Sequence, residues 1–334
     1  MSTAPRVTVV IPVYNREAYV AAALDSVLAQ SFADFELLVV DDGSTDNSRA
    51  IVGAHDDQRI RLVANDRNRG IAVTRNRAVG LARGDYLAFL DSDDIACPDR
   101  LARQVDFLDG HPDVAAVGGW VAWMDGDGRR LGTVKRVPTA PDDIAAGRLF
   151  RPGVINTTAM ARSAVLRDFP HREDLAVGSD FDMWARFASV HKVANLPAVV
   201  GMFRDHDSRA TGEFASQVAT VRHGIYAAQL TALGIAFTEK DLERHFMLRR
   251  MHKVGFTPDG DYLDWSEAWL LGLQTANRVT GLYPEPAFSH ELGVFWAKAC
   301  RHAPAPVRFL ASPLKRCAWP GLWKLARRHA AMAT

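Results

Sequence analysis

Two kinds of segment alternate along the first quarter of the chain. Short apolar runs that are typical of buried strands occupy residues 7–13, 35–40, 59–63 and 86–90. Between them, apolar residues recur at helical spacing over residues 17–30, 45–52 and 71–82. Strands that alternate with helices form parallel βαβ units. The pattern therefore predicts an α/β domain with a Rossmann-like, mostly parallel sheet flanked by helices.

Capping residues predict where two of these helices begin and end. Ser44 or Thr45 can cap the second helix, because either hydroxyl can accept a hydrogen bond from a first-turn N–H. Gly84 should stop the third helix in front of the strand 86–90.

The rest of the chain predicts more sheet and then a run of helices. Residues 114–124 have the composition of a strand, and Asp125 to Gly128 that of a hairpin turn. Helical spacing returns over residues 214–233, 239–254 and 262–279. These stretches predict a helical C-terminal appendage.

Two of the predicted strands end on acidic residues. Asp41 and Asp42 follow one, and Asp91, Asp93 and Asp94 follow another. Parallel sheets bind ligands outside the carboxyl ends of their strands, and Mg²⁺ and Mn²⁺ prefer carboxylate and phosphate oxygens. The chain has neither a Gly-x-Gly-x-x-Gly turn after its first strand nor a P-loop, so a metal would have to hold a diphosphate. The alternative is a solvated turn in which Asp94 caps the next helix.

Composition narrows the class of protein. The 334 residues carry a net charge of +1, which gives no indication of nucleic-acid binding. The three cysteines, at 97, 300 and 317, are too few and too scattered for a disulfide framework or a zinc site. The apolar run 7–13 is too short for a secretory signal, and no run reaches 18 apolar residues. We therefore expect a cytoplasmic protein.

Four motifs occur in order along this framework: Val9 to Asn15, Val39 to Asp46, Gly70 to Asn76, and Phe89 to Asp94. Together they resemble the glycosyltransferases of family 2, which have the GT-A fold, over about residues 5–210. The resemblance implies a catalytic domain at 1–212, with a nucleotide-sugar half at 5–110 and an acceptor half at 111–212. Residues 213–334 form the helical region.

The resemblance also implies the donor site. A nucleotide-diphosphate sugar would bind Pro12, Tyr14, Asn15, Asp41, Asp42, Arg75, Asp91, Ser92 and Arg204. Mn²⁺ or Mg²⁺ would bind Asp93 and His206, the latter in a segment, 201–208, that is similar to the family's closing Tyr-Arg-x-His-x-x-Ser stretch.

Residues 178–186 resemble the family's Glu-Asp-x-Asp-x-Trp segment, with Ser179 in place of Glu. The resemblance makes Asp180 the general base. Asn156, Thr157 and Trp184 would lie on the acceptor side, with residues 156–160 as a strand beside it. The structural alternative for Asp180 is a helix N-cap, and Asp182 is left as structural or acceptor-facing.

The implied activity is inverting transfer of a sugar from a nucleotide-diphosphate sugar, preferentially a UDP-sugar, to an acceptor hydroxyl. It would serve the synthesis of polysaccharide, lipopolysaccharide or another cell-surface glycan. One alternative is a sugar nucleotidyltransferase, although residues 13–16 lack that class's glycine-rich basic loop. The other is an inactive nucleotide-sugar binding module, which the Ser179 departure favours.

Tryptophans alternate with lysines and arginines over residues 307–329, and no acidic residue follows Glu291. This composition favours an interfacial helix on an anionic membrane. The family resemblance implies a glycan or lipid-linked acceptor, at the inner face of the cytoplasmic membrane. The alternative is a helix that packs its tryptophans on the protein.

Overall fold

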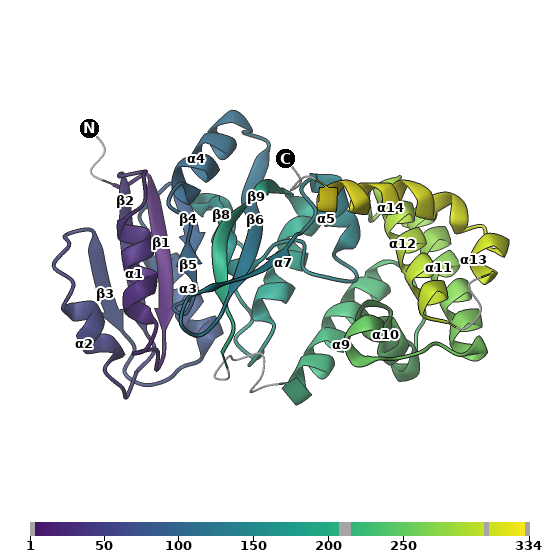
Figure 1. Ribbon diagram of the computed structural model, residues 1–334, viewed down its shortest axis with the longest axis horizontal. Coiled ribbons are helices and arrows are strands. Elements are labelled where there is room, and N and C mark those ends of the chain that lie inside the picture. Colours follow the sequence, from purple (N-terminus) through teal and green to yellow (C-terminus); the bar gives the residue numbers. More distant parts are fainter. Residues whose placement is uncertain (1–3, 207–214, 304–306, 331–334) are drawn as a thin grey trace. The chain divides into compact units, whose positions relative to one another are not determined.

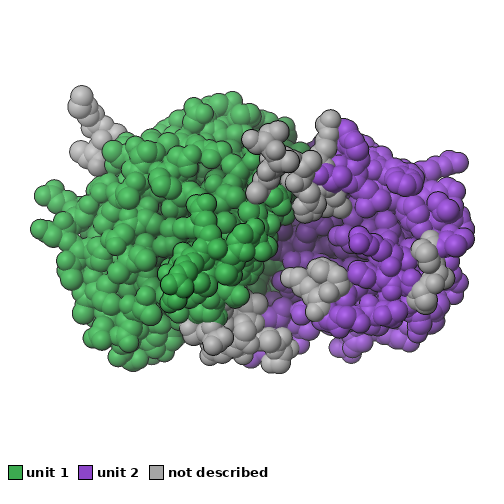
Figure 2. All heavy atoms as spheres, in the orientation of Figure 1, with its two compact units in different colours: residues 1–141, 153–215 green, residues 142–152, 216–334 purple. Residues whose placement is uncertain are grey.

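Two compact units make up the chain in the computed structural model, which describes residues 4–206, 215–303 and 307–330. Residues 1–141 and 153–215 form the sheet unit (Figure 2, green). Residues 142–152 and 216–334 form the helical unit (Figure 2, purple). The expected boundary after residue 212 lies outside the described residues, and no sequence pattern indicates that 142–152 belongs to the helical unit.

The first half of the sheet unit is the predicted parallel sheet with helices between its strands (Figure 1). The elements are β1 (Val7–Val13), α1 (Val20–Leu28), β2 (Phe35–Asp41), α2 (Ser48–Gly53), β3 (Ile60–Ala64), α3 (Ile71–Leu81) and β4 (Tyr86–Phe89). The strands lie in the order β3-β2-β1-β4, and all three pairings are parallel. β1, β2 and β4 are buried throughout, as continuous apolar runs require.

The second half of the sheet unit adds strands that run in both directions. They are β5 (Ile95–Ala96), β6 (Val114–Met124), β7 (Arg130–Lys135), β8 (Met160–Arg162) and β9 (Lys192–Arg204), with helices α4 (Arg100–Gly110), α6 (Ser163–Leu166) and α7 (Ser179–Val190). β8 is antiparallel to both β4 and β6, whereas β6 and β9 are parallel. The predicted strand at 114–124 and the hairpin that follows it are confirmed.

Three local predictions are wrong. α2 begins at Ser48, because Ser44 and Thr45 are occupied by hydrogen bonds to Asn15 in a neighbouring loop. α3 ends at Leu81, since Ala82 already has extended dihedral angles, so Gly84 does not stop it. The expected strand at 156–160 begins as a short 3-10 turn and joins β8 only at its last residue.

Gly84 has a different role, which predicts a large effect of substitution. A Cβ at this position would lie 2.5 Å from the backbone nitrogen of Thr8 and 2.7 Å from the carbonyl carbon of Val7. Because both atoms belong to the backbone at the start of β1, Gly84→Ala should lower the free energy of unfolding by ~2 kcal/mol or more. Gly80→Ala is the matched control, because nothing lies within 4 Å of its Cβ in α3. Denaturant unfolding that gave the two variants equal stability would contradict this packing.

The helical unit packs its helices around α12. Its elements are α5 (Pro141–Gly147), α9 (Ala215–Ala232), α10 (Glu239–Val254), α11 (Gly260–Thr280), α12 (Ala287–His302), α13 (Arg308–Ala311) and α14 (Lys315–Ala330). The expected helices at 214–233, 239–254 and 262–279 correspond to α9, α10 and α11. α12 buries Phe288, Leu292, Phe295 and Trp296 and packs against α10, α11 and α14. No helix within the described ranges is long and apolar enough to cross a membrane.

His245 of α10 predicts a pH dependence of stability. Its Nδ1 accepts a hydrogen bond from the indole of Trp269, and its Nε2 lies 3.0 Å from the carbonyl oxygen of Leu149. Both contacts suit a neutral ring, and burial lowers the pKa of His245 from 6.5 to about 4. Between pH 4 and pH 6.5, His245 is protonated in the unfolded chain but not in the folded one. The stabilisation that its neutral ring contributes is therefore complete above pH 6.5 and is lost as the pH falls toward 4.

The loss of this stabilisation by His245 should approach ~3 kcal/mol in the free energy of unfolding. The measurement is the difference in free energy of unfolding between the wild type and His245→Gln, followed from pH 7 to pH 4. This difference should shrink as the pH falls. A difference independent of pH would contradict the neutral buried ring.

Candidate active site

The predicted acidic residues gather at one edge of the sheet, where the strand order reverses between β1 and β4. Leu90 donates its N–H to the carbonyl of Val10, and Asp42 donates its N–H to the carbonyl of Val13. The residues that follow β1, β2 and β4 therefore all lie at the carboxyl ends of parallel strands. This is where open α/β sheets bind their ligands.

The loops that follow β1 and β2 are joined by hydrogen bonds. Asn15, whose φ of 50° is left-handed, accepts a hydrogen bond at Oδ1 from the Thr45 N–H at 2.9 Å. The Arg16 N–H donates to Ser48 Oγ at 2.7 Å. These bonds hold Tyr14, which is 40% exposed, at the rim of the edge, while Pro12 stays buried in β1.

The two carboxylates at the carboxyl end of β2, Asp41 as its last residue and Asp42 directly after it, face different partners. Asp42 accepts three hydrogen bonds, from the Asn65 amide at 2.6 Å and from the backbone N–H groups of Arg69 and Gly70 at 2.9 Å each. Asp41 accepts only long bonds, of 3.3 and 3.4 Å, from the Ser44 N–H. Asp42 therefore shapes the loop before α3, and Asp41 keeps more of its capacity to accept a hydrogen bond.

Asp91 is held from two sides. The Arg75 guanidinium on α3 pairs with its Oδ1 at 2.8 Å, and the Asp91 N–H donates to Thr157 Oγ1 at 3.0 Å. Burial raises the pKa of Asp91, whereas the charge of Arg75 opposes this shift and the charges of Asp93 and Asp180 add to it. Arg75 and Asp91, predicted separately, therefore form one ion pair at the sheet edge.

Asp93 and His206, the two predicted metal ligands, meet directly. Their Oδ2 and Nε2 atoms lie 3.1 Å apart, and Arg16 Nε lies 3.4 Å from the same carboxylate oxygen. The contact arises because β5 pairs with the end of β9, which brings the chain after Asp93 alongside the chain before His206. Residues 207 and 208 of the closing segment lie outside the described residues.

An oxygen and an imidazole nitrogen on adjacent side chains are chemically suitable ligands for Mn²⁺ or Mg²⁺. Within residues 4–206, 215–303 and 307–330, no group of three or more His, Cys, Asp or Glu side chains could hold a metal by itself. Asp93 and His206 thus fit a metal that takes its remaining ligands from a bound diphosphate and water.

Asp94 does not cap the next helix, so that alternative is wrong. α4 starts six residues later, at Arg100, with Asp99 at its N-cap. Asp94 instead points inward and accepts the backbone N–H of Arg204 at 3.0 Å. Burial and the charges of Asp93 and Asp91 raise the pKa of Asp94 well above its ordinary value. Asp94 therefore ties the acidic loop to the end of β9.

Two arginines support the same loop. Arg204, a predicted donor-site residue, donates from Nε to the carbonyl oxygen of Asp93 at 2.9 Å and stacks over the Tyr19 ring at 5.0 Å. Arg100 is fully buried beneath the loop and donates to the carbonyl oxygens of Phe89 and Thr157 at 2.7 and 2.8 Å. The family pattern continues through residues 98–101 at the start of this helix, but the burial of Arg100 beneath the loop depends on tertiary packing and has no signal in the local sequence.

Asp180 lies in the first turn of α7, and the helix is capped by Gly178, so Asp180 is not an N-cap. Its side chain is half-buried, and its charge acts on both Asp91 and His171. Asp182, in the same turn, pairs with Arg186 at 2.8 Å and is almost fully buried. The fold thus brings Asp180 to the acidic cluster and gives Asp182 a structural partner.

His171 is a site residue that no sequence pattern indicates. It is 3% exposed, and its backbone is held by two 2.8 Å hydrogen bonds to the Asn76 side chain. Burial and the charge of Arg75 lower the pKa of His171 to about 3, so the ring is neutral, although the charge of Asp180 opposes the shift. His171 therefore places an uncharged imidazole between α3 and the start of α7.

The predicted acceptor-side residues are buried, as is Ser92. The indole of Trp184 donates to Asn156 Oδ1 at 3.2 Å, and Thr157 accepts from the Asp91 backbone. In this structure the three residues link α7 and the 3-10 turn to the acidic loop. Their contact with an acceptor stays a prediction.

Comparison with known proteins agrees with this architecture. The family model described as "Glycosyl transferase family 2" matches residues 8–169. The putative glycosyltransferase EpsE of Bacillus subtilis is 34% identical over 190 residues, which are 56% of this chain and 68% of EpsE. The succinoglycan biosynthesis protein ExoO of Rhizobium meliloti is 37% identical over 191 residues, which are 54% of this chain and 55% of ExoO.

Solved structures share the fold. TarS of S. aureus in complex with UDP-GlcNAc has a TM-score of 0.56 at 20% identity, and the match covers 89% of each chain. The mannosyltransferase PcManGT of Pyrobaculum calidifontis in complex with GDP-Man and Mn²⁺ has a TM-score of 0.54 at 19% identity, over 97% of this chain and 88% of that one. The chain belongs to glycosyltransferase family 2 and has the GT-A fold of these enzymes.

Proposed function

We propose that this chain is a metal-dependent, inverting glycosyltransferase that moves a sugar from a UDP-sugar to an acceptor hydroxyl. The observation that carries the proposal is the convergence of three features at one sheet edge. These are the Asp93–His206 pair, the Asp91–Arg75 ion pair and the half-buried Asp180. The likeness to ExoO, a polysaccharide biosynthesis protein, supports a role in cell-surface glycan synthesis. Residues 1–212 would form the catalytic domain.

The nucleoside of the donor would bind at the joined loops after β1 and β2. The exposed ring of Tyr14 offers a surface for the base, and Asp41 has the capacity to accept from the base or ribose. Asp91 would face the ribose and sugar, with its carboxylate oriented by Arg75. A UDP-sugar is the favoured donor because TarS, which shares the fold, was solved with UDP-GlcNAc.

Asp93 and His206 would hold Mn²⁺ or Mg²⁺. The bound ion would offset the negative charge that develops on the departing nucleoside diphosphate. Arg16 Nε lies 3.4 Å from the Asp93 carboxylate and would orient it toward this position, while Arg204 holds the backbone carbonyl oxygen of Asp93. The Mn²⁺ bound by PcManGT in the same fold supports the assignment.

Asp180 would take the proton from the acceptor hydroxyl as that oxygen attacks the anomeric carbon from the face opposite the leaving group. A single displacement inverts the configuration of that carbon, in contrast to the two displacements of a retaining enzyme. The neutral ring of His171 adds no charge that would hold Asp180 in an ion pair. The acceptor would be a glycan or a lipid-linked sugar, reached at the inner face of the cytoplasmic membrane.

Thermal shift with a panel of nucleotide sugars, each with and without Mn²⁺, tests the proposal. A ligand at a hundred times its dissociation constant should stabilise the chain by about 2.7 kcal/mol, and the effect should need Mn²⁺. Slow release of nucleoside diphosphate, with water as acceptor, distinguishes an enzyme from an inactive binding module. Release of pyrophosphate from a nucleoside triphosphate and a sugar phosphate would instead indicate a nucleotidyltransferase. Failure of every nucleotide sugar to bind would overturn the proposal.

A further inference from the structure

Exposed large apolar side chains gather at the end of the helical unit. Of the nine in the described part of the chain, four lie between residues 307 and 323. They are Val307 at 75% exposure, Leu310 at 58%, Trp319 at 62% and Trp323 at 57%. The six other tryptophans of the chain are buried or half-buried. Exposure of two tryptophans one helical turn apart is therefore specific to α14.

Close backbone packing determines which face of α14 is exposed. A Cβ on Gly293 of α12 would lie 2.4 Å from the Ala318 nitrogen, and a Cβ on Gly321 would lie 2.7 Å from the His290 carbonyl oxygen. The two helices thus meet through glycines, with Leu314 and Ala318 buried. Because the helix cannot rotate without a backbone clash, the tryptophans point away from α12.

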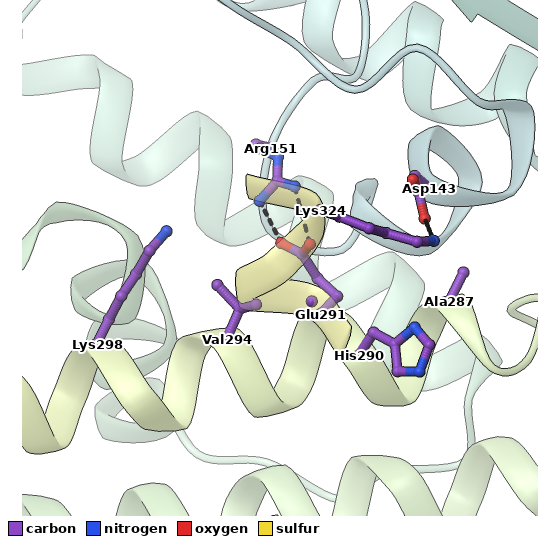
Figure 3. Close-up of a pocket in the computed structure, with 9 residues that line it drawn as sticks. Asp143, Arg151, Ala287, His290, Glu291, Val294, Lys298 and Lys324 are labelled. Carbon is purple, nitrogen blue, oxygen red and sulfur yellow. Dashed lines mark hydrogen bonds and ion pairs between the residues drawn. The ribbon is translucent and has the colours of Figure 1, made fainter. Parts of the chain in front are cut away.

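A second contact holds α14 along its length. Lys324 pairs with Asp143 of α5 at 2.6 Å, and Figure 3 shows this pair beside the ion pair of Arg151 with Glu291. Glu291 and Asp143 are thus used inside the helical unit. Arg308 of α13 is likewise paired with an acid, Asp264, at 2.7 Å, whereas Arg316 of α14 is exposed and no acidic residue follows Glu291 in the sequence.

The exposed strip combines apolar and basic residues at helical spacing. Arg316, Trp319 and Trp323 stand at i, i+3 and i+7, so they share one face, and all three are exposed. The Phe309 ring of α13 lies edge-on to Trp319 at 6.0 Å, next to the exposed Leu310. Indole rings beside guanidinium groups match the interface between lipid headgroups and acyl chains, and the positive charge matches anionic lipid.

We propose that this strip, formed by α13 and the exposed face of α14, docks the chain on the surface of an anionic lipid bilayer. The indoles of Trp319 and Trp323 insert at the level of the headgroups, while Arg316 contacts lipid phosphates. The proposal does not depend on which donor the sheet unit uses. It concerns where the enzyme works.

Vesicle co-sedimentation of the full chain tests the proposal. The wild type should bind vesicles of phosphatidylcholine mixed with phosphatidylglycerol, and bind less as salt is raised, because salt screens the attraction. Trp319→Ala combined with Trp323→Ala should weaken binding at least ~10-fold, since both interfacial anchors are removed. Arg316→Glu should weaken binding to the mixed vesicles but not to phosphatidylcholine alone. Val279→Ala removes an apolar residue that is 84% exposed on α11 and should bind as the wild type does.

Two outcomes would overturn the proposal. One is a wild type that does not bind the mixed vesicles at low salt, or a double variant that binds them equally well. The other is a wild type that does not bind vesicles but forms a dimer, detected by light scattering, which the double variant does not form. The strip would then contact a second copy of the chain. Unchanged thermal unfolding and unchanged nucleotide-sugar binding in the double variant would confirm that its fold and donor site are intact. Failure of the membrane-docking proposal would therefore not affect the proposed transfer activity.

Discussion

Asp180→Asn should lower the rate of sugar transfer by ~10²–10⁴-fold while donor affinity stays unchanged. The substitution keeps the size of the side chain but removes the group that takes the proton, and general-base catalysis contributes about 10²–10⁴-fold to such reactions. Asp180 lies in the first turn of α7, and its charge acts on Asp91 and His171. The measurement is release of nucleoside diphosphate from the donor identified by thermal shift.

Asp182→Asn is the matched control, because it lies in the same helical turn and has a structural partner in Arg186. Loss of the Asp182 carboxylate should lower the stability of the fold, while most of the transfer rate should remain. If Asp180→Asn kept the wild-type rate, or if Asp182→Asn alone abolished transfer, the base would have to be another residue.

Asp93→Ala should abolish transfer for a different reason, with a loss of at least ~10³-fold that added Mn²⁺ does not restore. The substitution removes the carboxylate that meets His206, and with it the charge stabilisation of the departing diphosphate. The dependence of the rate on Mn²⁺ concentration is the measurement. Asp99→Ala removes a carboxylate that is 56% exposed at the start of α4, and it should respond to Mn²⁺ as the wild type does.

The strands that carry the site are predictable because they are long and continuously apolar. β1, β2 and β4 match their predicted positions within one residue, and the carboxylates after β2 and β4 lie where the sheet binds ligands. The meeting of Asp93 with His206 depends on β5, however, which is only two residues long. A pairing that short leaves no periodic pattern in the sequence.

Other parts of the site cannot be predicted from the sequence because they depend on tertiary contacts. The hydroxyl of Thr157, a residue predicted to lie on the acceptor side, accepts the backbone N–H of Asp91. Arg100 is buried under the acidic loop, and His171 is held by Asn76, which is 95 residues away in sequence. None of these contacts follows from local spacing, whereas the ion pair of Arg75 with Asp91 joins two residues that both lie in predicted motifs.

Calorimetric titration of the donor into the wild type, Asp93→Ala and Asp180→Asn, each with and without Mn²⁺, tests the proposed activity most directly. We expect Mn²⁺ to raise donor affinity in the wild type and in Asp180→Asn, because both keep the pair of Asp93 with His206. We expect no such gain in Asp93→Ala. Equal donor affinity for Asp93→Ala and the wild type, with and without Mn²⁺, would contradict the assignment of the metal site and of the mechanism built on it.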